Sequence, residues 1–286
     1  MRLKYKLLDK MKNLKSTEMD FLLFVARFQN LKGEIIGVHH SMVTKGTGMC
    51  KQSFYTAMRG LEDKGLISVR KRSAIDYDIM ILDNDFSYDG AFQKGQDGYV
   101  NLHRKVFHTK RFQKMKAHEK YMLMYFLKIT HKGSGSYWIG TKTFYEKFKN
   151  ELHVSYRVIR SYLHKMRYFF SIGIKRGLYY ITYKSSIFEQ KAEKGVEDTE
   201  LDAFVEAWCR RLKVKSPTPD QVHDVSWLYK QYRPTLQAMG MNLLHFYPIL
   251  GQAIQDTVLQ EEIPKYRKLN PAFVHKKVRI ALFGFC

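Results

Sequence analysis

Residues 48–67 have the sequence GMCKQSFYTAMRGLEDKGLI, and the local structure that they encode decides the fold. After Cys50, hydrophobic residues recur at helical spacing, which places them on one face of a helix: Phe54, Ala57, Met58 and Leu61. We predict that this helix ends at Lys64 and Gly65, because glycine readily adopts the left-handed conformation that terminates helices. A strand over residues 67–69 and a basic hairpin tip at 70–73 are predicted to follow.

This order of helix, glycine stop and basic hairpin resembles the winged helix-turn-helix domain of bacterial DNA-binding proteins. The match rests on the small residue Cys50, the two polar residues after it, and the ending Leu-Glu-Asp-Lys-Gly-Leu-Ile at 61–67. The residues around it predict the remaining parts: a helix from Thr17, a strand at 34–38, a positioning helix at 39–45 and a returning strand at 75–82. The alternative is an amphipathic helix that an unrelated hairpin happens to follow.

The resemblance implies that the exposed polar side chains of the helix enter the major groove and that the hairpin contacts the DNA backbone or minor groove. The helix residues placed at the DNA are Lys51, Gln52, Ser53, Tyr55, Thr56 and Arg59. Those of the hairpin are Arg70, Lys71 and Arg72.

The same pattern recurs later in the chain. A helix at 117–131, a turn at 133–136, a strand at 137–139 and a helix at 141–149 precede a second recognition helix, for which Ser155 is a good N-cap. A tight basic hairpin follows at 172–183. Cys50 and Ser155 occupy equivalent places, and no gap is needed through the rest of either helix. The second set of predicted DNA contacts is Tyr156, Arg157, Arg160, Ser161, Lys165, Lys175 and Arg176.

We therefore predict a mainly α-helical fold with small β-hairpin wings, made of two winged helix-turn-helix domains and a helical C-terminal domain. The predicted boundaries are 1–82 with a basic N-terminal arm, a linker at 83–98, a second domain at 99–184, a linker at 185–199 and the helical domain at 200–286. All six prolines lie in the last of these, where we expect them to mark breaks between helices. The N-terminal arm has leucines at helical spacing, which favours a role in covering the first core.

The charge favours a polyanionic partner. The 286 residues include 49 Lys and Arg against 27 Asp and Glu, a formal charge of +22. Residues 200–286 contain only 12 basic and 8 acidic residues, so most of the excess lies in the first two thirds. Such a field attracts nucleic acid first and anionic membranes second. No apolar run is long enough to span a membrane, and no signal peptide is recognised.

No chemistry of catalysis is recognised in the sequence. The three cysteines, Cys50, Cys209 and Cys286, have the spacing of neither a disulfide framework nor a metal site, and they fit a reducing cytoplasm. No phosphate-binding loop for ATP is present. We expect no catalytic residues, no metal and no cofactor.

These observations favour a non-enzymatic protein that binds double-stranded DNA in the bacterial cytoplasm, associated with the nucleoid. Its use is predicted to be transcription regulation, with replication initiation on a plasmid or other mobile element as the alternative. Residues 200–286 would then bind a protein partner or mediate self-association. A further alternative is that the winged helices bind proteins, although their exposed faces are basic and polar rather than acidic or apolar.

Overall fold

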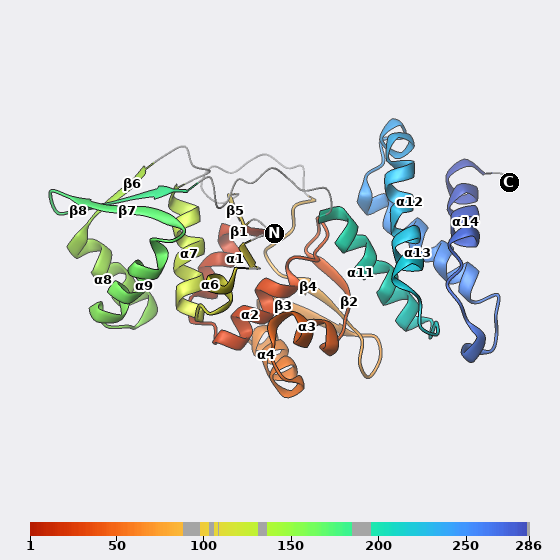
Figure 1. Cartoon of the computed structure of the whole chain (residues 1–286), viewed down its shortest axis with the longest axis horizontal. Helices are drawn as coiled ribbons and strands as arrows, with labels where there is room; N and C mark the ends of the chain where they lie inside the picture. Colours follow the sequence, from red (N-terminus) through yellow and green to blue (C-terminus); the bar gives the residue numbers. More distant parts are fainter. Residues whose placement is uncertain (88–97, 103–105, 108, 131–135, 185–195, 285–286) are drawn as a thin grey trace. The chain divides into compact units, whose positions relative to one another are not determined.

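The computed structural model describes residues 1–87, 98–102, 106–107, 109–130, 136–184 and 196–284 (Figure 1). It is mainly helical, with small antiparallel sheets. Its contacts separate two compact units, and each is described by itself. Unit 1 comprises residues 1–27, 43–68 and the described residues from 81 to 184. Unit 2 comprises residues 28–42, 69–80 and the described residues from 196 onward.

The N-terminal residues of unit 1 are part of its core. They form β1 (Arg2–Lys4), α1 (Tyr5–Lys10) and the short 3-10 helix η1 (Met11–Asn13). The apolar residues of this segment are buried, as the covering role predicted: Leu3, Leu7, Leu8, Met11 and Leu14. β1 pairs with β5 (Tyr99–Asn101), so the segment joins residues that we had assigned to two different domains.

The predicted linker at 83–98 begins as ordered chain. Asp83 forms ion pairs with Lys6 and Lys10, at 2.7 and 2.6 Å. Asn84 is buried and accepts a hydrogen bond from the backbone N–H of Lys4 at 2.8 Å. Residues 88–97 lie outside the described residues, as do 185–195 of the second predicted linker and 131–135, which include most of the turn predicted at 133–136.

The two predicted repeats have the same order of elements. The first has α2 (Ser16–Val25), β2 (Glu34–Val38), α3 (His40–Thr47), α4 (Lys51–Asp63), β3 (Ile67–Lys71) and β4 (Tyr77–Ile81). After the short α6 (Lys110–Gln113), the second has α7 (Ala117–Thr130), β6 (Ser136–Gly140), α8 (Thr141–Leu152), α9 (Tyr156–Met166), β7 (Phe170–Lys175) and β8 (Leu178–Tyr183). The strand orders, β2-β4-β3 and β6-β8-β7, also match, because the last strand of each repeat lies in the middle of its sheet.

Each repeat contains a buried glutamate at the start of its first helix. Glu18 accepts a hydrogen bond from the backbone N–H of Lys15 at 2.8 Å, and its other contact is the Lys64 ammonium at the end of α4. Glu119 accepts in the same way from the backbone N–H of Lys116 at 3.0 Å. A carboxylate that caps its own helix and binds a lysine keeps its charge compensated in the core. Glu18 binds Lys64 of the α4 end, and Glu119 binds Lys165 of α9. Each glutamate therefore attaches the first helix of its repeat to the helix predicted to face DNA.

The first helices of the two repeats contact each other within unit 1. Ser16 Oγ lies 3.4 Å from the backbone nitrogen of Ala117, a residue 101 positions later. The nearly buried Lys120 ammonium forms an ion pair with Asp20. These contacts connect the two repeats through equivalent helix starts.

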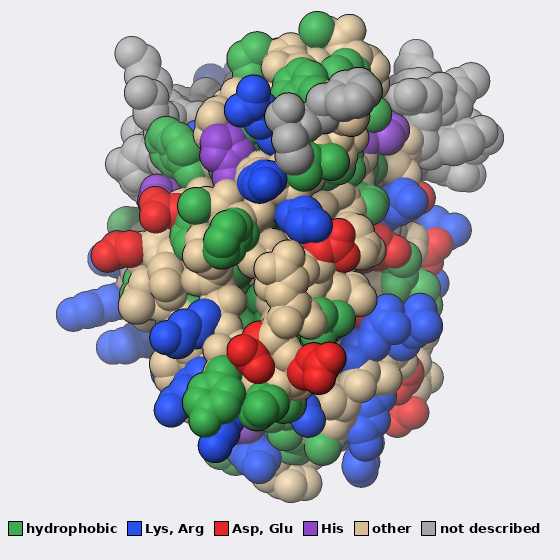
Figure 2. Space-filling model, turned by 90° about the vertical axis from the view of Figure 1, so that its right-hand side faces the viewer, with side chains coloured by type: hydrophobic (Ala, Val, Ile, Leu, Met, Phe, Trp, Pro, Cys, Tyr) green, Lys and Arg blue, Asp and Glu red, His purple; other side chains and the backbone are tan. Residues whose placement is uncertain are grey.

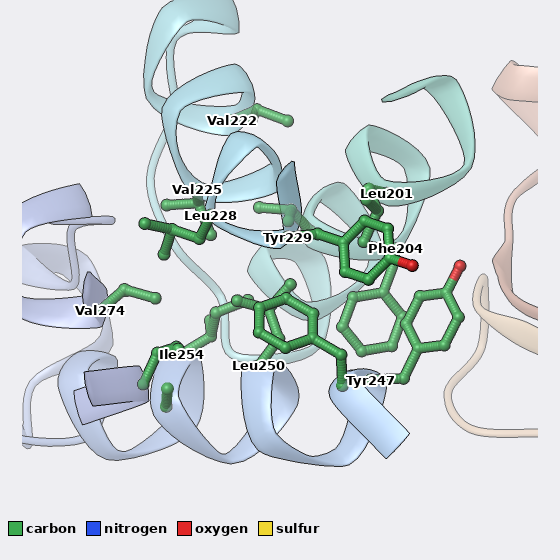
Figure 3. Close-up of a cluster of buried hydrophobic side chains, with 14 of the residues drawn as sticks. Leu201, Phe204, Val222, Val225, Leu228, Tyr229, Tyr247, Leu250, Ile254 and Val274 are labelled. Carbon is green, nitrogen blue, oxygen red and sulfur yellow. The ribbon is translucent and has the colours of Figure 1, made fainter. Parts of the chain in front are cut away.

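Unit 2 contains the C-terminal helices, which share one apolar core (Figure 3). The helices are α11 (Val196–Arg211), α12 (Pro219–Ala238), α13 (Leu243–Val258) and α14 (Pro271–Phe283), with the 3-10 helix η3 (Pro264–Tyr266) before the last one. In Figure 3, Phe204, Tyr229, Tyr247 and Leu250 converge between α11, α12 and α13.

The prolines of unit 2 do not all mark breaks as predicted. Pro219, Pro264 and Pro271 occupy the first positions of helical segments, where a missing N–H costs nothing. Pro234 and Pro248, in contrast, lie inside α12 and α13. A proline has no N–H to donate to the carbonyl one turn earlier in the helix. Both prolines are exposed, so that carbonyl lies on the solvent-facing side of the helix.

The α14 side of unit 2 exposes apolar and basic side chains beside one another (Figure 2). Phe273 is 53% exposed and Phe283 is 47% exposed, and Lys276 is also exposed. None of the described helices has the length and apolar character needed to cross a bilayer.

Candidate nucleic-acid interface

α4 has the two faces that its sequence predicted. Phe54, Ala57, Met58 and Leu61 are buried, and Phe54 packs against Phe21 of α2 with ring centroids 5.4 Å apart. Among the predicted contact residues, the exposed ones are Lys51, Gln52, Thr56 and Arg59, whereas Ser53 and Tyr55 are half-buried. The basic and polar face of α4 is therefore open to a ligand.

The ends of α4 also follow the prediction. Cys50 occupies the N-cap position in an extended conformation, although its side chain makes no capping hydrogen bond; its Sγ lies 3.2 Å from Ser53 Oγ. That hydrogen bond is the largest cause of a lowered pKa at the Cys50 thiol. Gly65 has a φ of 65°, and Leu66 N–H donates to the Leu61 carbonyl at 3.0 Å, which closes the helix.

α9 repeats the same division. Its buried residues are Ile159, Tyr162, Leu163 and Met166, which correspond to the four buried residues of α4 when Cys50 and Ser155 are aligned. Ser155 is the N-cap residue, but its side chain makes no capping hydrogen bond. The exposed residues Tyr156, Arg157, Arg160 and Ser161 lie on the remaining face, as predicted.

Lys165 requires a different interpretation from the one predicted. Its ammonium lies 2.6 Å from Oε1 of Glu119, whose side chain is 2% exposed. The side chain of Lys165 is 48% exposed, so it bridges from the surface to a buried carboxylate. We infer that Lys165 holds α9 on α7 and does not contact DNA. If its ammonium turned to a DNA phosphate, the buried Glu119 carboxylate would lose the cation that compensates its charge. No local sequence pattern predicts this pair, because the two residues are 46 positions apart.

Tyrosines support the N-terminal half of α9. The hydroxyls of Tyr145 and Tyr179 lie 3.0 Å apart, and the Tyr145 ring packs at a tilt against the Tyr156 ring, with 5.4 Å between centroids. A hydrogen bond to Tyr145 raises the pKa of the exposed Arg160 guanidinium. Lys149 lies over the Tyr156 ring at 5.4 Å. Sequence reasoning did not single out Tyr145, although its side chain orients two of the predicted contact residues.

The two hairpins present their basic residues in different ways. In the first, Arg70, Lys71 and Arg72 are exposed, but Arg72 Nε donates to Asp78 Oδ2 at 2.6 Å and is partly neutralised. In the second, Lys175 and Arg176 are exposed at a two-residue turn. Arg176 and Gly177 have φ values of 50° and 73°, as the tight type I′ turn of a hairpin requires.

The charge is concentrated in the second repeat. Between Glu151 and Glu189 the sequence has seven Lys and Arg residues and no Asp or Glu. This segment contains α9, β7 and β8. Its field therefore attracts an anionic ligand to both the helix and the hairpin.

No group of three or more His, Cys, Asp or Glu residues within the described residues is placed to hold a metal ion. Comparisons with protein-family models, with curated proteins and with solved structures gave no match to this chain.

Proposed function

We propose that the protein binds double-stranded DNA through two winged helix-turn-helix domains and acts as a bacterial transcription regulator. The observation that carries this proposal is the repetition of one arrangement. In each repeat, a helix with a buried apolar face and an exposed basic face precedes a basic hairpin, with the same element order and strand order. The bacterial cytoplasm, at the nucleoid, is the place that this activity implies.

In this mechanism α4 and α9 each enter a major groove. Arg59 of α4 and Arg160 of α9 are exposed arginines, and arginine donates two hydrogen bonds to the acceptor edge of guanine. Lys71, Lys175 and Arg176 contact phosphates, which positions the protein without selecting a sequence.

The same surfaces serve a replication initiator that binds short repeats at an origin. The presence of two recognition helices in one chain favours that alternative, because one molecule then contacts successive groove segments without a homodimer. Genomic context separates the two uses: direct repeats beside the gene favour initiation, and a divergent promoter favours regulation. If the exposed faces bind a protein instead, duplex DNA will not bind at low salt.

The test is a salt titration of binding to a random duplex and to the DNA upstream of the gene. We expect a steep salt dependence on both, with tighter binding upstream. Arg59→Ala and Arg160→Ala should each weaken upstream binding by about 1–3 kcal/mol and random-duplex binding much less. Lys71→Ala should weaken both DNAs alike and lower the salt slope by about 1.

Arg279→Ala is the matched control, since Arg279 is an exposed arginine of α14. It should leave both affinities unchanged. If the unmodified protein binds neither DNA at about 50 mM salt, where phosphate contacts are strong, the proposal fails. If the three variants lose the same affinity on both DNAs, the assignment of base contacts to Arg59 and Arg160 fails.

A further inference from the structure

The sheet of the second repeat exposes two aromatic side chains on the face opposite its core. Tyr179 and Ile181 of β8 are buried, so the residue between them, Tyr180, points to the other face. Tyr180 pairs with Trp138 on β6 and with Gly173 on β7. Trp138 is 65% exposed and Tyr180 is 36% exposed. Because the two residues are cross-strand neighbours, they form a contiguous exposed aromatic patch, and such patches mark binding sites more often than single exposed residues do.

The equivalent face in the first repeat is covered by α11, whereas no described helix is packed on Trp138 and Tyr180 in the second. The two sheets can be superimposed by their strand pairing, because Glu34 pairs with Met80 in the first as Ser136 pairs with Thr182 in the second. In this alignment Ile36 occupies the position of Trp138. Ile36 packs against the apolar core of the C-terminal helices. The neighbouring Gly37 faces Ala207 of α11 so closely that a Cβ at position 37 would overlap it.

The two faces also differ in charge: the first carries carboxylates that bind α11, and the second does not. The same alignment matches Asp78 with Tyr180. Asp78 and Asp76 both form ion pairs with Arg211 of α11, which fixes that helix on the first sheet. In the second repeat a tyrosine replaces the carboxylate, and Lys175 and Arg176 provide only positive charge at the hairpin tip. A helix attached through an arginine, as α11 is through Arg211, would therefore find no carboxylate at this position.

We propose that the outer face of β6, β8 and β7 binds single-stranded nucleic acid. Trp138 and Tyr180 lie on adjacent strands, about 4.8 Å apart, so their rings can stack on successive unpaired bases. A Cβ at Gly173 would meet nothing within 4 Å, which leaves room for a base beside the Tyr180 ring. Lys175 and Arg176 bind the phosphates. Aromatic rings stack on every base, so binding depends little on sequence.

This activity shares the basic residues Lys175 and Arg176 with the duplex binding proposed above, but its aromatic residues lie on the sheet and not on α4 or α9. A protein that binds both forms of DNA can retain a strand after the duplex opens. The two activities are therefore measured on separate DNAs, and one can fail without the other.

The experiment uses the full chain and a fluorescein-labelled oligothymidylate of 20 nucleotides, with anisotropy as the readout. Trp138→Ala and Tyr180→Ala should each weaken binding roughly 5- to 150-fold, the range that the loss of one stacked base produces. Trp138→Phe should retain most of the affinity, because a phenyl ring still stacks. Random-duplex affinity should stay unchanged in all three variants.

Trp227→Ala is the matched control. Trp227 is also an exposed tryptophan, 48% accessible, but it lies on α12 among the C-terminal helices. It should bind oligothymidylate as the unmodified protein does. The proposal is overturned if Trp138→Ala and Tyr180→Ala bind as tightly as this control. It is equally overturned if they change the sedimentation of the free protein and leave oligothymidylate binding intact, since the face would then contact another protein.

Discussion

Replacing Arg211 by alanine should destabilise unit 2 strongly. Arg211 Nε lies 2.8 Å from Asp76 Oδ2, and its terminal nitrogen binds Asp78. The Asp76 side chain is 5% exposed, and Arg211 and Asp78 are each 18% exposed. Two unit charges about 4 Å apart at an effective dielectric constant of 20 attract each other by about 4 kcal/mol. The arginine therefore offsets the cost of burying two carboxylates.

The loss should fall mainly on Asp76. Asp78 keeps Arg72 at 2.6 Å and the backbone N–H of Gly37 at 3.1 Å after the substitution. Asp76 loses its ion pair with Arg211 and keeps only the longer-range attraction of the Arg210 guanidinium. Removing one partner of a buried ion pair costs about 3–5 kcal/mol, and we expect Arg211→Ala to lower the free energy of unfolding of unit 2 by that amount.

Urea unfolding followed by tryptophan fluorescence measures this loss. Trp208 and Trp227 lie in unit 2 and Trp138 lies in unit 1, so a Trp138→Phe background restricts the signal to unit 2. Hydrogen exchange of residues 69–80 gives a second readout, because these residues form the hairpin that Arg211 holds.

A second substitution tests the cause. In the Arg211→Ala background, Asp76→Asn removes the uncompensated charge and should restore part of the stability. Lys215→Ala, at an exposed lysine shortly after α11, should change the free energy of unfolding by less than about 0.5 kcal/mol. The reasoning is refuted if Arg211→Ala stays within about 1 kcal/mol of the unmodified protein, or if Asp76→Asn destabilises it further.

Two other predictions concern packing and thiol chemistry. Gly60→Ala should lower the free energy of unfolding in urea by about 1–3 kcal/mol, because the added Cβ would overlap the buried Glu18 carboxylate. Gly173→Ala is the control and should lower it clearly less, because a Cβ there meets open space. Equal losses in the two variants would contradict this account. With the C-terminal cysteine replaced by serine, iodoacetamide should modify Cys50 and spare Cys209 until the protein unfolds, as peptide mass spectrometry can show. A hydrogen bond from a serine hydroxyl lowers the pKa of the exposed Cys50 thiol, whereas burial raises the pKa of Cys209 to about 12. Faster alkylation of Cys209 would exclude this order.

Local patterns predicted the elements well, because the physics that forms them is local. The apolar spacing in α4 identified its four buried residues, and the glycine at position 65 identified its end. The N-cap of α14 is equally local, because Asn270 accepts hydrogen bonds from the backbone N–H groups of Ala272 and Phe273. In α9, Tyr162 is buried although it had been left unassigned, because a tyrosine fits a core face and a polar face equally well by pattern alone.

The contacts that join distant segments could not be predicted. The pairing of β1 with β5 and the ion pairs of Arg211 with Asp76 and Asp78 connect residues that no periodicity links. Glu18, in the first turn of α2, is a buried partner of Lys64, and no periodicity links these two residues either. Composition placed the positive charge in the first two thirds of the chain, but only the structure shows that Lys165 and Arg72 are already paired.

The discontinuity of unit 2 limits how the gene can be divided. A fragment ending at residue 184 would retain β2 and β4 but lose α11. Ile36 and Gly37 would then be exposed to water, Asp76 would lose its ion pair with Arg211, and Asp78 would retain only Arg72. The complementary fragment would leave Arg210 and Arg211 facing water. Functional dissection of this protein should therefore proceed by point substitution or by co-expressing both pieces. Natural variation in residues 76–78 should be accompanied by changes at 210–211 in related chains.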